Sequence, residues 1–247
     1  MKKMKKYITM CVLGILPYVT LAQNEDKKID LDAILLFDQM GEAIGELNSV
    51  SFHLSTITEE PGTDKDIKKL YNECDVKMVG PDKMSVKQHS MDTHSAYYYN
   101  GKVITYYSFK ENNYVTVEAP SNIIDMIDFM HDNFSMDFPA ADFFYPTFTD
   151  DIIENFNSIT YIGLELLGGV ECNLAKIENE NVSVKIWISA EDHTLPKQFE
   201  ITYKKKDNLK FQATFSDWQL NPELNDDIFE FEPPTSARLI SVLIAKS

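Results

Sequence analysis

Residues 97–146 constrain the fold more than any other stretch of the chain. Two aromatic runs turn at Asn100 and Gly101, and Asn-Gly between alternating apolar residues is the strongest short signal for a β-hairpin, because both residues tolerate a positive φ. A third strand is expected after a turn at 110–113. Two short apolar helices then follow, the second beginning at Pro139. A sheet that leads into apolar helices halfway along the chain requires those helices to cover part of it.

The first of these helices carries one continuous apolar stripe. Its apolar residues recur at helical spacing and share one face, while the intervening aspartates face elsewhere. The second helix adds two adjacent aromatic side chains. The two lid elements therefore contribute Ile123, Ile127, Met130, Phe134, Phe143 and Phe144. Such a stripe is more often part of a core than of a ligand site, and both readings stay open at this point.

The rest of the chain reads as β-rich, with a helix at its start. An amphipathic helix is expected over 31–47 with Asp30 as its N-cap, and a charged loop over 59–69 follows the first strand. The second half consists of strands and turns, and Phe229 and Phe231 are expected to end the sheet. These short strands, taken as antiparallel throughout, predict a mostly β α+β fold. In it the sheet is strongly curved or forms an unclosed barrel, and the short helices cover part of it.

The N-terminus has the pattern of a cleavable secretory signal peptide over 1–22. Basic residues precede an uncharged apolar run, and Thr20 and Ala22 place small residues before a cleavage site after Ala22. The run is too short for a comfortable membrane span, and no other stretch is apolar enough to cross a bilayer. The mature chain, 23–247, is therefore expected to form a single domain in the periplasm, with no stable membrane span.

The net charge of the mature chain limits the kinds of partner that it can bind. Removing the four lysines of the signal peptide leaves 19 basic against 39 acidic residues, so the net charge changes from −16 to −20. Such a surface repels nucleic acid and anionic lipid headgroups. The mature chain keeps two cysteines, Cys74 and Cys172, which could form a disulfide in an oxidising compartment or remain thiols.

The sequence carries no motif that would indicate catalysis. It contains no G-x-S-x-G nucleophile elbow, phosphate-binding loop, dinucleotide glycine pattern or H-E-x-x-H. His89, Met91, Asp92 and His94 could attract a metal only if their segment bends, and a solvated polar turn explains them better. We therefore expect no catalytic residue, no metal, no cofactor and no enzymatic activity.

Six segments occur in an order that resembles a known family. They are YYYNGKVITYYSFKENNYVTVEAP, DFPAADFFYP, YIGLELLGGVECNLAKI, WISAEDHTLPKQFEITYK, FSDWQL and FEFEPPTSA. The chain resembles a bacterial family of predicted periplasmic proteins of unknown function, which is placed with the LolA-like lipoprotein-carrier and sensor folds. The resemblance covers nearly the whole mature chain and implies an unclosed barrel whose helices shield an apolar cavity. In carrier relatives, that cavity holds lipid or the acyl chains of lipoproteins.

Two functions follow as hypotheses. In the first, the protein is a non-enzymatic carrier that binds a lipid or a lipoprotein acyl chain, with Tyr99, Val103 and Tyr107 lining the sheet side of the cavity beneath the lid. In the second, side chains fill the core, and the protein is a periplasmic interaction or envelope-sensing module. Its partner would then be an envelope protein rather than an apolar small molecule.

Overall fold

The computed structural model describes residues 27–63, 66–191 and 193–241. The expected signal peptide over 1–22 lies outside the described residues. Within them the chain forms a 13-stranded, largely antiparallel sheet and three α-helices, which confirms the mostly β α+β class. The span expected to form one domain contains two compact units. The first unit takes in residues up to 45, 140–196 and 201–208, and the second takes in 46–139, 197–200 and residues from 209 onward.

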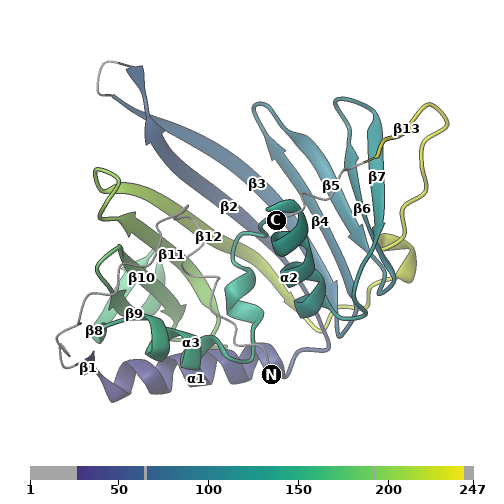
Figure 1. Cartoon of the computed structure of the whole chain (residues 1–247). Coiled ribbons are helices and arrows are strands. Elements are labelled where there is room, and N and C mark those ends of the chain that lie inside the picture. The colour runs from purple at the N-terminus through teal and green to yellow at the C-terminus, as the bar shows by residue number, and fades with distance from the viewer. Residues whose placement is uncertain (1–26, 64–65, 192, 242–247) are drawn as a thin grey trace. The chain divides into compact units, whose positions relative to one another are not determined.

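The first unit combines helices with four neighbouring strands (Figure 1). The strands lie in the order β1, β8, β9 and β10. Strand β11 (Pro196–Tyr203) is divided between the units. The elements of the first unit are β1 (Lys28–Ile29), α1 (Leu31–Gly45), the 3-10 helix η2 (Ala141–Phe144), α3 (Phe148–Asn155), β8 (Ser158–Leu167), β9 (Val170–Glu178) and β10 (Val182–Ser189).

Helix α1 begins where the sequence predicts. The Asp30 carboxylate accepts a hydrogen bond from the Asp32 backbone N–H at 3.0 Å, which satisfies one of the N–H groups that an α-helix leaves unpaired at its start. The helix buries one apolar face and contacts η2, α3 and β8. On that face the rings of Phe37 and Phe148 meet edge to face at 5.8 Å between centroids. This packing fixes α1 and α3 against each other.

The second unit is an eight-stranded run with one helix. Its strands lie in the order β12, β2, β3, β4, β5, β6, β7 and β13 (Figure 1). The elements are β2 (Ser49–Pro61), β3 (Ile67–Val79), β4 (Lys83–Ser90), β5 (His94–Tyr99), β6 (Val103–Ser108), β7 (Asn113–Glu118), α2 (Ile123–Phe134), β12 (Leu209–Leu220), the 3-10 helix η3 (Asp226–Ile228) and β13 (Arg238–Leu239).

The hairpin predicted at Asn100 and Gly101 is confirmed, with a connection of three residues. The Asn100 carboxamide oxygen accepts hydrogen bonds from the backbone N–H groups of Lys102 and Val103, both at 3.1 Å, so the side chain closes the turn. Gly101 has a φ of +85°. A Cβ there would lie 2.7 Å from Oδ2 of Asp82, so the turn requires glycine both for its backbone and for its surroundings.

Three expectations from the sequence are wrong. The charged stretch 59–69 is mostly strand, because its charges lie opposite each other across β2 and β3, as in the pairs Glu59–Lys69 and Glu60–Lys68. The sheet is not antiparallel throughout, since β1 joins β8 and β13 joins β7 in parallel. Phe229 and Phe231 do not end the sheet. They follow η3 in a non-strand segment in which Phe229 is almost fully buried.

Candidate functional site: two faces of one sheet

The strands of the second unit place alternate side chains on two faces. Tyr99 is paired with Met84 on one side and Ile104 on the other, so these three side chains share a face. We call this the inner face. Tyr107 is paired with Ala96 and belongs to the opposite face, the outer face, together with Tyr98.

The inner face lies against α2 and the segments that flank it (Figure 1). The Tyr99 hydroxyl donates a hydrogen bond to the backbone carbonyl of Pro120, just before the helix. The ring of Tyr97 meets that of Phe138, just after the helix, at 5.3 Å between centroids. The helix is fixed at its start by Asn122, whose side chain accepts a hydrogen bond from the Asp125 N–H at 2.8 Å. Both ends of α2 are thus held to this face.

The contact between α2 and the inner face is apolar. The buried side chains of the helix are Ile123, Met126, Ile127 and Met130. Facing residues of the sheet include Met84, Val86 and Ile104, all buried. Burial raises the pKa values of Tyr97 and Tyr99 to about 12, so both phenols stay neutral. The arrangement is suited to apolar contact and carries no charge.

The predicted cavity residues are only partly brought together. Ile123, Ile127, Met130 and Tyr99 meet in the apolar layer between α2 and the sheet. Phe134 ends the same helix, half-buried, with its ring 5.8 Å from that of Phe129.

The remaining four lie elsewhere. Val103 and Tyr107 point to the outer face, because the three-residue turn pairs Tyr99 with Ile104 rather than with Val103. Phe143 and Phe144 belong to the first unit, where the ring of Phe143 stacks on Phe148 at 5.1 Å.

One residue of the layer was missed. Met126 is fully buried at the centre of α2. It lies three residues after Ile123 and four before Met130, so the helical periodicity that identified its neighbours also includes it. The stripe predicted from the sequence contains the residues four, seven and eleven positions after Ile123, and Met126 lies three positions after it.

The outer face is covered by residues 221–239, which we call the C-terminal strap (Figure 1, yellow). Lys83 Nζ donates to the Asp226 carboxylate at 2.6 Å, and Asn100 Nδ2 donates to the Glu230 carboxylate at 2.9 Å. At its far end the strap pairs with β7 through β13. Its main aromatic anchor, Phe231, lies with its ring centroid 5.5, 5.2 and 5.0 Å from those of Tyr98, Tyr107 and Tyr114.

A groove with a volume of about 690 Å³ lies between the strap and the outer face. Its floor is formed by residues of β12 and of β2 to β6, and its wall by residues 227–234 of the strap. This volume is within the usual range for small-molecule sites. The lining mixes aromatic rings, carboxylates and two lysines, so the groove differs in kind from the apolar layer on the inner face.

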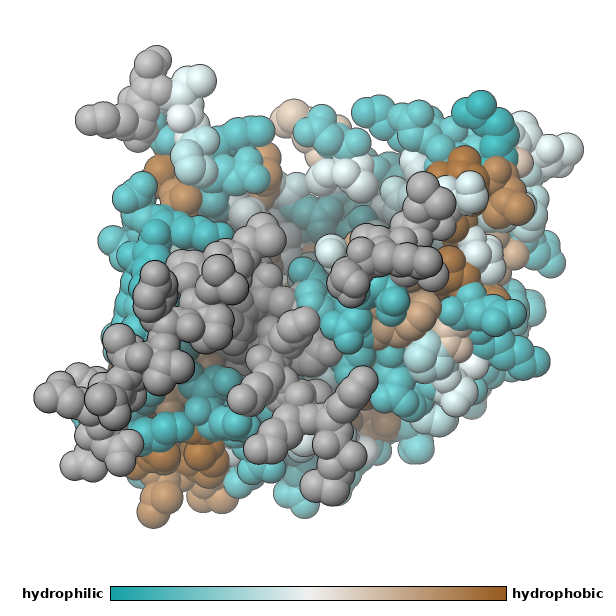
Figure 2. All heavy atoms as spheres, in the orientation of Figure 1, coloured by the Kyte–Doolittle hydropathy of each residue, from teal (hydrophilic) through white to brown (hydrophobic). Residues whose placement is uncertain are grey.

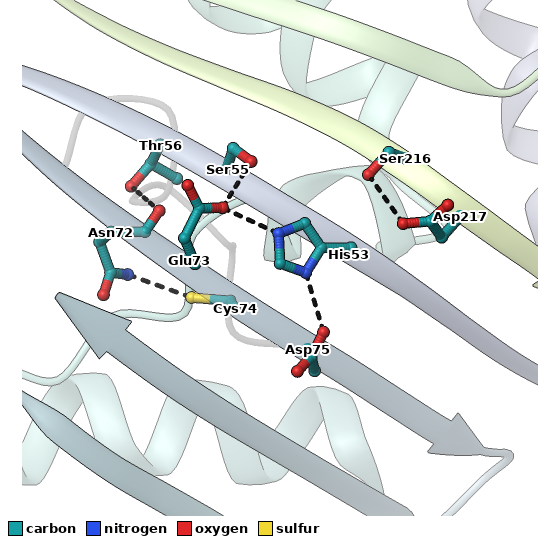
Figure 3. A network of polar contacts seen from close by, with 9 residues as sticks. All are labelled: His53, Ser55, Thr56, Asn72, Glu73, Cys74, Asp75, Ser216 and Asp217. Carbon is teal, nitrogen blue, oxygen red and sulfur yellow. Dashed lines mark hydrogen bonds and ion pairs between the residues drawn. The ribbon is translucent and has the colours of Figure 1, made fainter.

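His53 lies in this groove at the centre of a polar network (Figure 3). Its Nδ1 is 2.8 Å from Oδ1 of Asp75, and its Nε2 is 2.8 Å from Oε2 of Glu73, which also accepts a hydrogen bond from Ser55. The hydrogen bond to Asp75 raises the pKa of His53, burial opposes this, and the bond to Glu73 adds to it. Both ring nitrogens contact carboxylates, which favours the protonated imidazole and leaves neither nitrogen directed at a nucleophile.

The two cysteines are both buried, one in each unit. Cys74 lies on the inner face, and Asn72 Nδ2 is 3.1 Å from its Sγ. Burial raises the pKa of this thiol to about 11, which makes it a poor nucleophile. Cys172 lies on β9 beside Leu174 and Trp187. Among the described residues the disulfide that the sequence allowed is not formed.

The described ranges contain neither a membrane-spanning helix nor a cluster of metal ligands. No helix there is long and apolar enough to cross a membrane. No group of three or more His, Cys, Asp or Glu side chains is placed to hold a metal ion in that part of the chain. In the segment considered as a metal site, His89 and His94 face each other across β4 and β5, and His94 stacks on Phe109 at 4.2 Å.

The fold defines a class that is already represented among solved structures. An uncharacterized conserved protein from Thermus thermophilus is 8% identical, with a TM-score of 0.52 over 85% of this chain and 98% of that one. The Mycobacterium tuberculosis lipoprotein LppX is 14% identical, with a TM-score of 0.50 over 81% and 100% of the two chains. A LolA superfamily protein from Nitrosomonas europaea is also similar, at 11% identity over 81% and 97%, with a TM-score of 0.34.

The sequence identifies the family within this class. Residues 33–243 match the family described as predicted periplasmic protein (DUF2092), and the chain belongs to it. This confirms the family that the sequence resembles, and the family's description agrees with the periplasmic location predicted from the N-terminus. No curated protein matches the sequence.

Proposed function

We propose that the protein binds an apolar ligand, a lipid or the acyl chain of a lipoprotein, between α2 and the inner face of the β2–β7 sheet, and that it does so without catalysis. The observation that carries the proposal is the apolar layer itself. One helix, held at both ends, covers a sheet face with Met126, Ile127 and Met130, and these meet uncharged aromatic and aliphatic side chains. An acyl chain inserted between α2 and this face would meet the same apolar side chains.

Burial of an acyl chain in this layer would contribute favourably to binding. Transfer of an acyl chain from water contributes about 0.8 kcal/mol per methylene group, so eight to ten buried methylenes correspond to about 6–8 kcal/mol, close to micromolar affinity. Methionine suits a layer that must repack, because its unbranched thioether side chain adapts to irregular neighbours. Met84, Met126 and Met130 supply three such side chains to the layer. The likeness to the lipoprotein LppX is a likeness of fold alone.

Native mass spectrometry of the mature protein, purified from the periplasm without detergent, tests the proposal. We expect a stoichiometric mass increment whose organic extract contains a lipid. Ile127→Asp places a charge in the apolar layer and should remove the bound lipid. Asp132→Asn, on an exposed position of the same helix, is the matched control and should retain it. A folded wild-type protein that is empty, or an Ile127→Asp protein that still carries lipid, would contradict the proposal.

A second candidate, a protein-interaction module, is supported by a separate observation in the first unit. Ile162, Leu164 and Leu166 of β8 are 50%, 57% and 75% exposed. The strand pairs along its length with β9, but with β1 only at its first two residues. A long outer strand with exposed apolar side chains is suited to accept an extended strand from a partner protein. Exposed Leu31 and Leu35 lie at the start of α1, where the surface is apolar (Figure 2, lower left).

The two candidates give different results in one pull-down from envelope extracts. Under the interaction proposal, Leu166→Lys should abolish capture of a partner and leave the lipid content unchanged. Glu180→Lys, which makes a larger charge change at an exposed position after β9 that does not pair with β8, is the control. Loss of capture in both variants would indicate a general charge effect and would contradict a specific role for the β8 edge.

A further inference from the structure

The groove on the outer face is lined by charged and aromatic side chains, which the proposed apolar-ligand site does not include. Because its floor crosses β2 to β6, its composition changes along its length. Asp217 of β12 and His53 of β2 lie at one end, while Tyr98 and Tyr107 of β5 and β6 lie at the other. The strap forms the wall along this length. The floor of the groove therefore presents charge at one end and aromatic rings at the other, and the wall adds the carboxylates of the strap.

The aromatic end offers ring surface to a ligand. Phe109 is 37% exposed, and its ring centroid lies 4.7 Å from that of Tyr107. Tyr98 and Phe231 are half-buried and lie 5.5 Å apart, so each keeps part of its ring toward the groove. The faces of aromatic rings carry partial negative charge and attract ammonium groups. This end is thus suited to a cation with apolar character.

Carboxylates outnumber ammonium groups in the lining, by five acidic residues to two lysines. Asp75 is held by His53 and lies opposite Lys87 in the strand register, so these charges offset one another. Asp217, on the bulge of β12, and the exposed strap residues Asp227 and Glu232 remain. Glu230 adds a fourth carboxylate, which accepts a hydrogen bond from a neutral amide. Of the two lysines in the lining, Lys77 does not lie opposite Asp75, and its charge opposes this excess of negative charge.

We propose that the groove binds an organic cation whose ammonium groups are separated by apolar chain, as in a polyamine or in the lysine side chains of a peptide. Carboxylates on β12 and the strap would hold the ammonium groups, and the chain between them would lie on the rings of Tyr98 and Phe109. A volume of about 690 Å³ exceeds what a single ammonium group needs, which favours an elongated ligand. The site lies on the face opposite to α2 and is independent of the apolar-ligand proposal.

Spermidine titration of the mature protein, followed by amide chemical shifts, tests the inference. Shifts should concentrate at groove residues, with those of Tyr98, Asp227 and Phe231 among the largest. The double variant Asp227→Asn/Glu232→Gln should raise the Kd for spermidine about tenfold, and Tyr98→Ala about fivefold. Lys77→Gln removes a repulsive charge and should lower the Kd about two- to threefold. That gain follows from the sign of the charge, because each positive charge removed from the groove lowers the repulsion of the ammonium groups.

A matched control separates specific binding from attraction to an acidic surface. Glu42→Gln/Glu46→Gln removes the same charge from exposed positions outside the groove lining and should leave the Kd unchanged. An equal loss in both double variants, or weaker binding in Lys77→Gln, would overturn the proposal. A trilysine peptide titrated in parallel identifies the source of the ammonium groups. Tighter binding of the peptide indicates a basic protein segment, and tighter binding of spermidine indicates a free polyamine.

Discussion

The two faces of the β2–β7 sheet are made by alternate residues of the same strands, yet they have opposite chemistry. Tyr99 is fully buried under the segment that leads into α2, whereas its neighbour Tyr98 borders the groove beneath the strap. The inner face combines neutral, apolar side chains with one helix. The outer face combines carboxylates, lysines, a histidine and exposed rings with a segment that has little regular structure.

The difference shows how one sheet can carry two separate sites. Because the side-chain period of a strand is two, a shift of one residue in register would exchange the faces. The register is fixed by turns such as that at Asn100–Lys102, where an asparagine side chain and a glycine with positive φ set the length of the connection. Substitutions on one face should therefore leave the ligand chemistry of the other unchanged.

The largest effect is expected on the inner face. Tyr99→Ala removes a fully buried ring and should lower the free energy of unfolding by about 3–5 kcal/mol, as buried aromatic truncations do. Urea denaturation measures the change. Tyr99→Phe keeps the ring and removes only the hydrogen bond to Pro120, so it should cost about 1 kcal/mol. Equal losses in the two variants would show that the hydroxyl, rather than apolar packing, holds this face to the segment before α2.

A smaller loss of unfolding free energy is expected when Phe231, which anchors the strap to the outer face, is truncated. Phe231→Ala removes the ring that contacts Tyr98, Tyr107 and Tyr114 and should cost about 2 kcal/mol, less than a fully buried phenylalanine because Phe231 is half-buried. Amide hydrogen exchange should accelerate over 230–239 and stay unchanged in α2. Glu223→Ala, at an exposed position of the strap, is the control. Accelerated exchange in α2 would contradict the independence of the two faces.

The inner face was the more predictable of the two. The hairpin at Asn100 and Gly101 and the apolar stripe of α2 rest on local patterns, namely a turn dipeptide and a helical period. Such signals lie within a few residues of each other. The sequence analysis places Val103 beside Tyr99, because strand alternation predicts two faces but does not say which residues of the next strand share a face with Tyr99. The length of the turn, which pairs Tyr99 with Ile104, decides that Val103 falls on the other face.

The outer face could not be predicted in the same way. Its wall comes from Phe231 and its neighbours, more than 100 residues away in sequence from the rings they contact, and no periodic pattern links the two. His53, Glu73 and Asp75 are separated in sequence as well, and they meet only because β2 and β3 pair in one particular register. The alternation of Phe229 and Phe231 suggested a strand. The proline-rich stretch that follows and the buried position of Phe229 favour a covering segment instead.

The turn that joins β5 to β6 offers a test of what keeps the faces apart. Gly101→Ala forces a side chain into positive φ and against Asp82, and should cost about 1–2 kcal/mol in unfolding free energy. In the double variant Gly101→Ala/Asp82→Ala, the clash between the new Cβ and Asp82 should be relieved. The cost of placing alanine at a positive φ should remain. Thermal unfolding of the two single variants and the double variant gives the coupling free energy between positions 101 and 82. Strictly additive losses would contradict the close approach of Gly101 to Asp82.

The smallest effect concerns His53, and it gives the outer face a dependence on pH that the inner face lacks. Since the carboxylate of Asp75 raises the pKa of His53 above 6.5, the folded protein binds the proton more tightly than the unfolded chain. The stabilisation is therefore complete below 6.5 and is lost as the pH rises through the folded-state pKa, with a total of at most about 1 kcal/mol for so exposed a pair. Urea denaturation between about pH 6 and 8.5, where histidines titrate, should show this decline, and His53→Gln should remove it. His131→Gln is the control, and a decline that survives in His53→Gln but vanishes in His131→Gln would assign the pH dependence to the end of α2 instead.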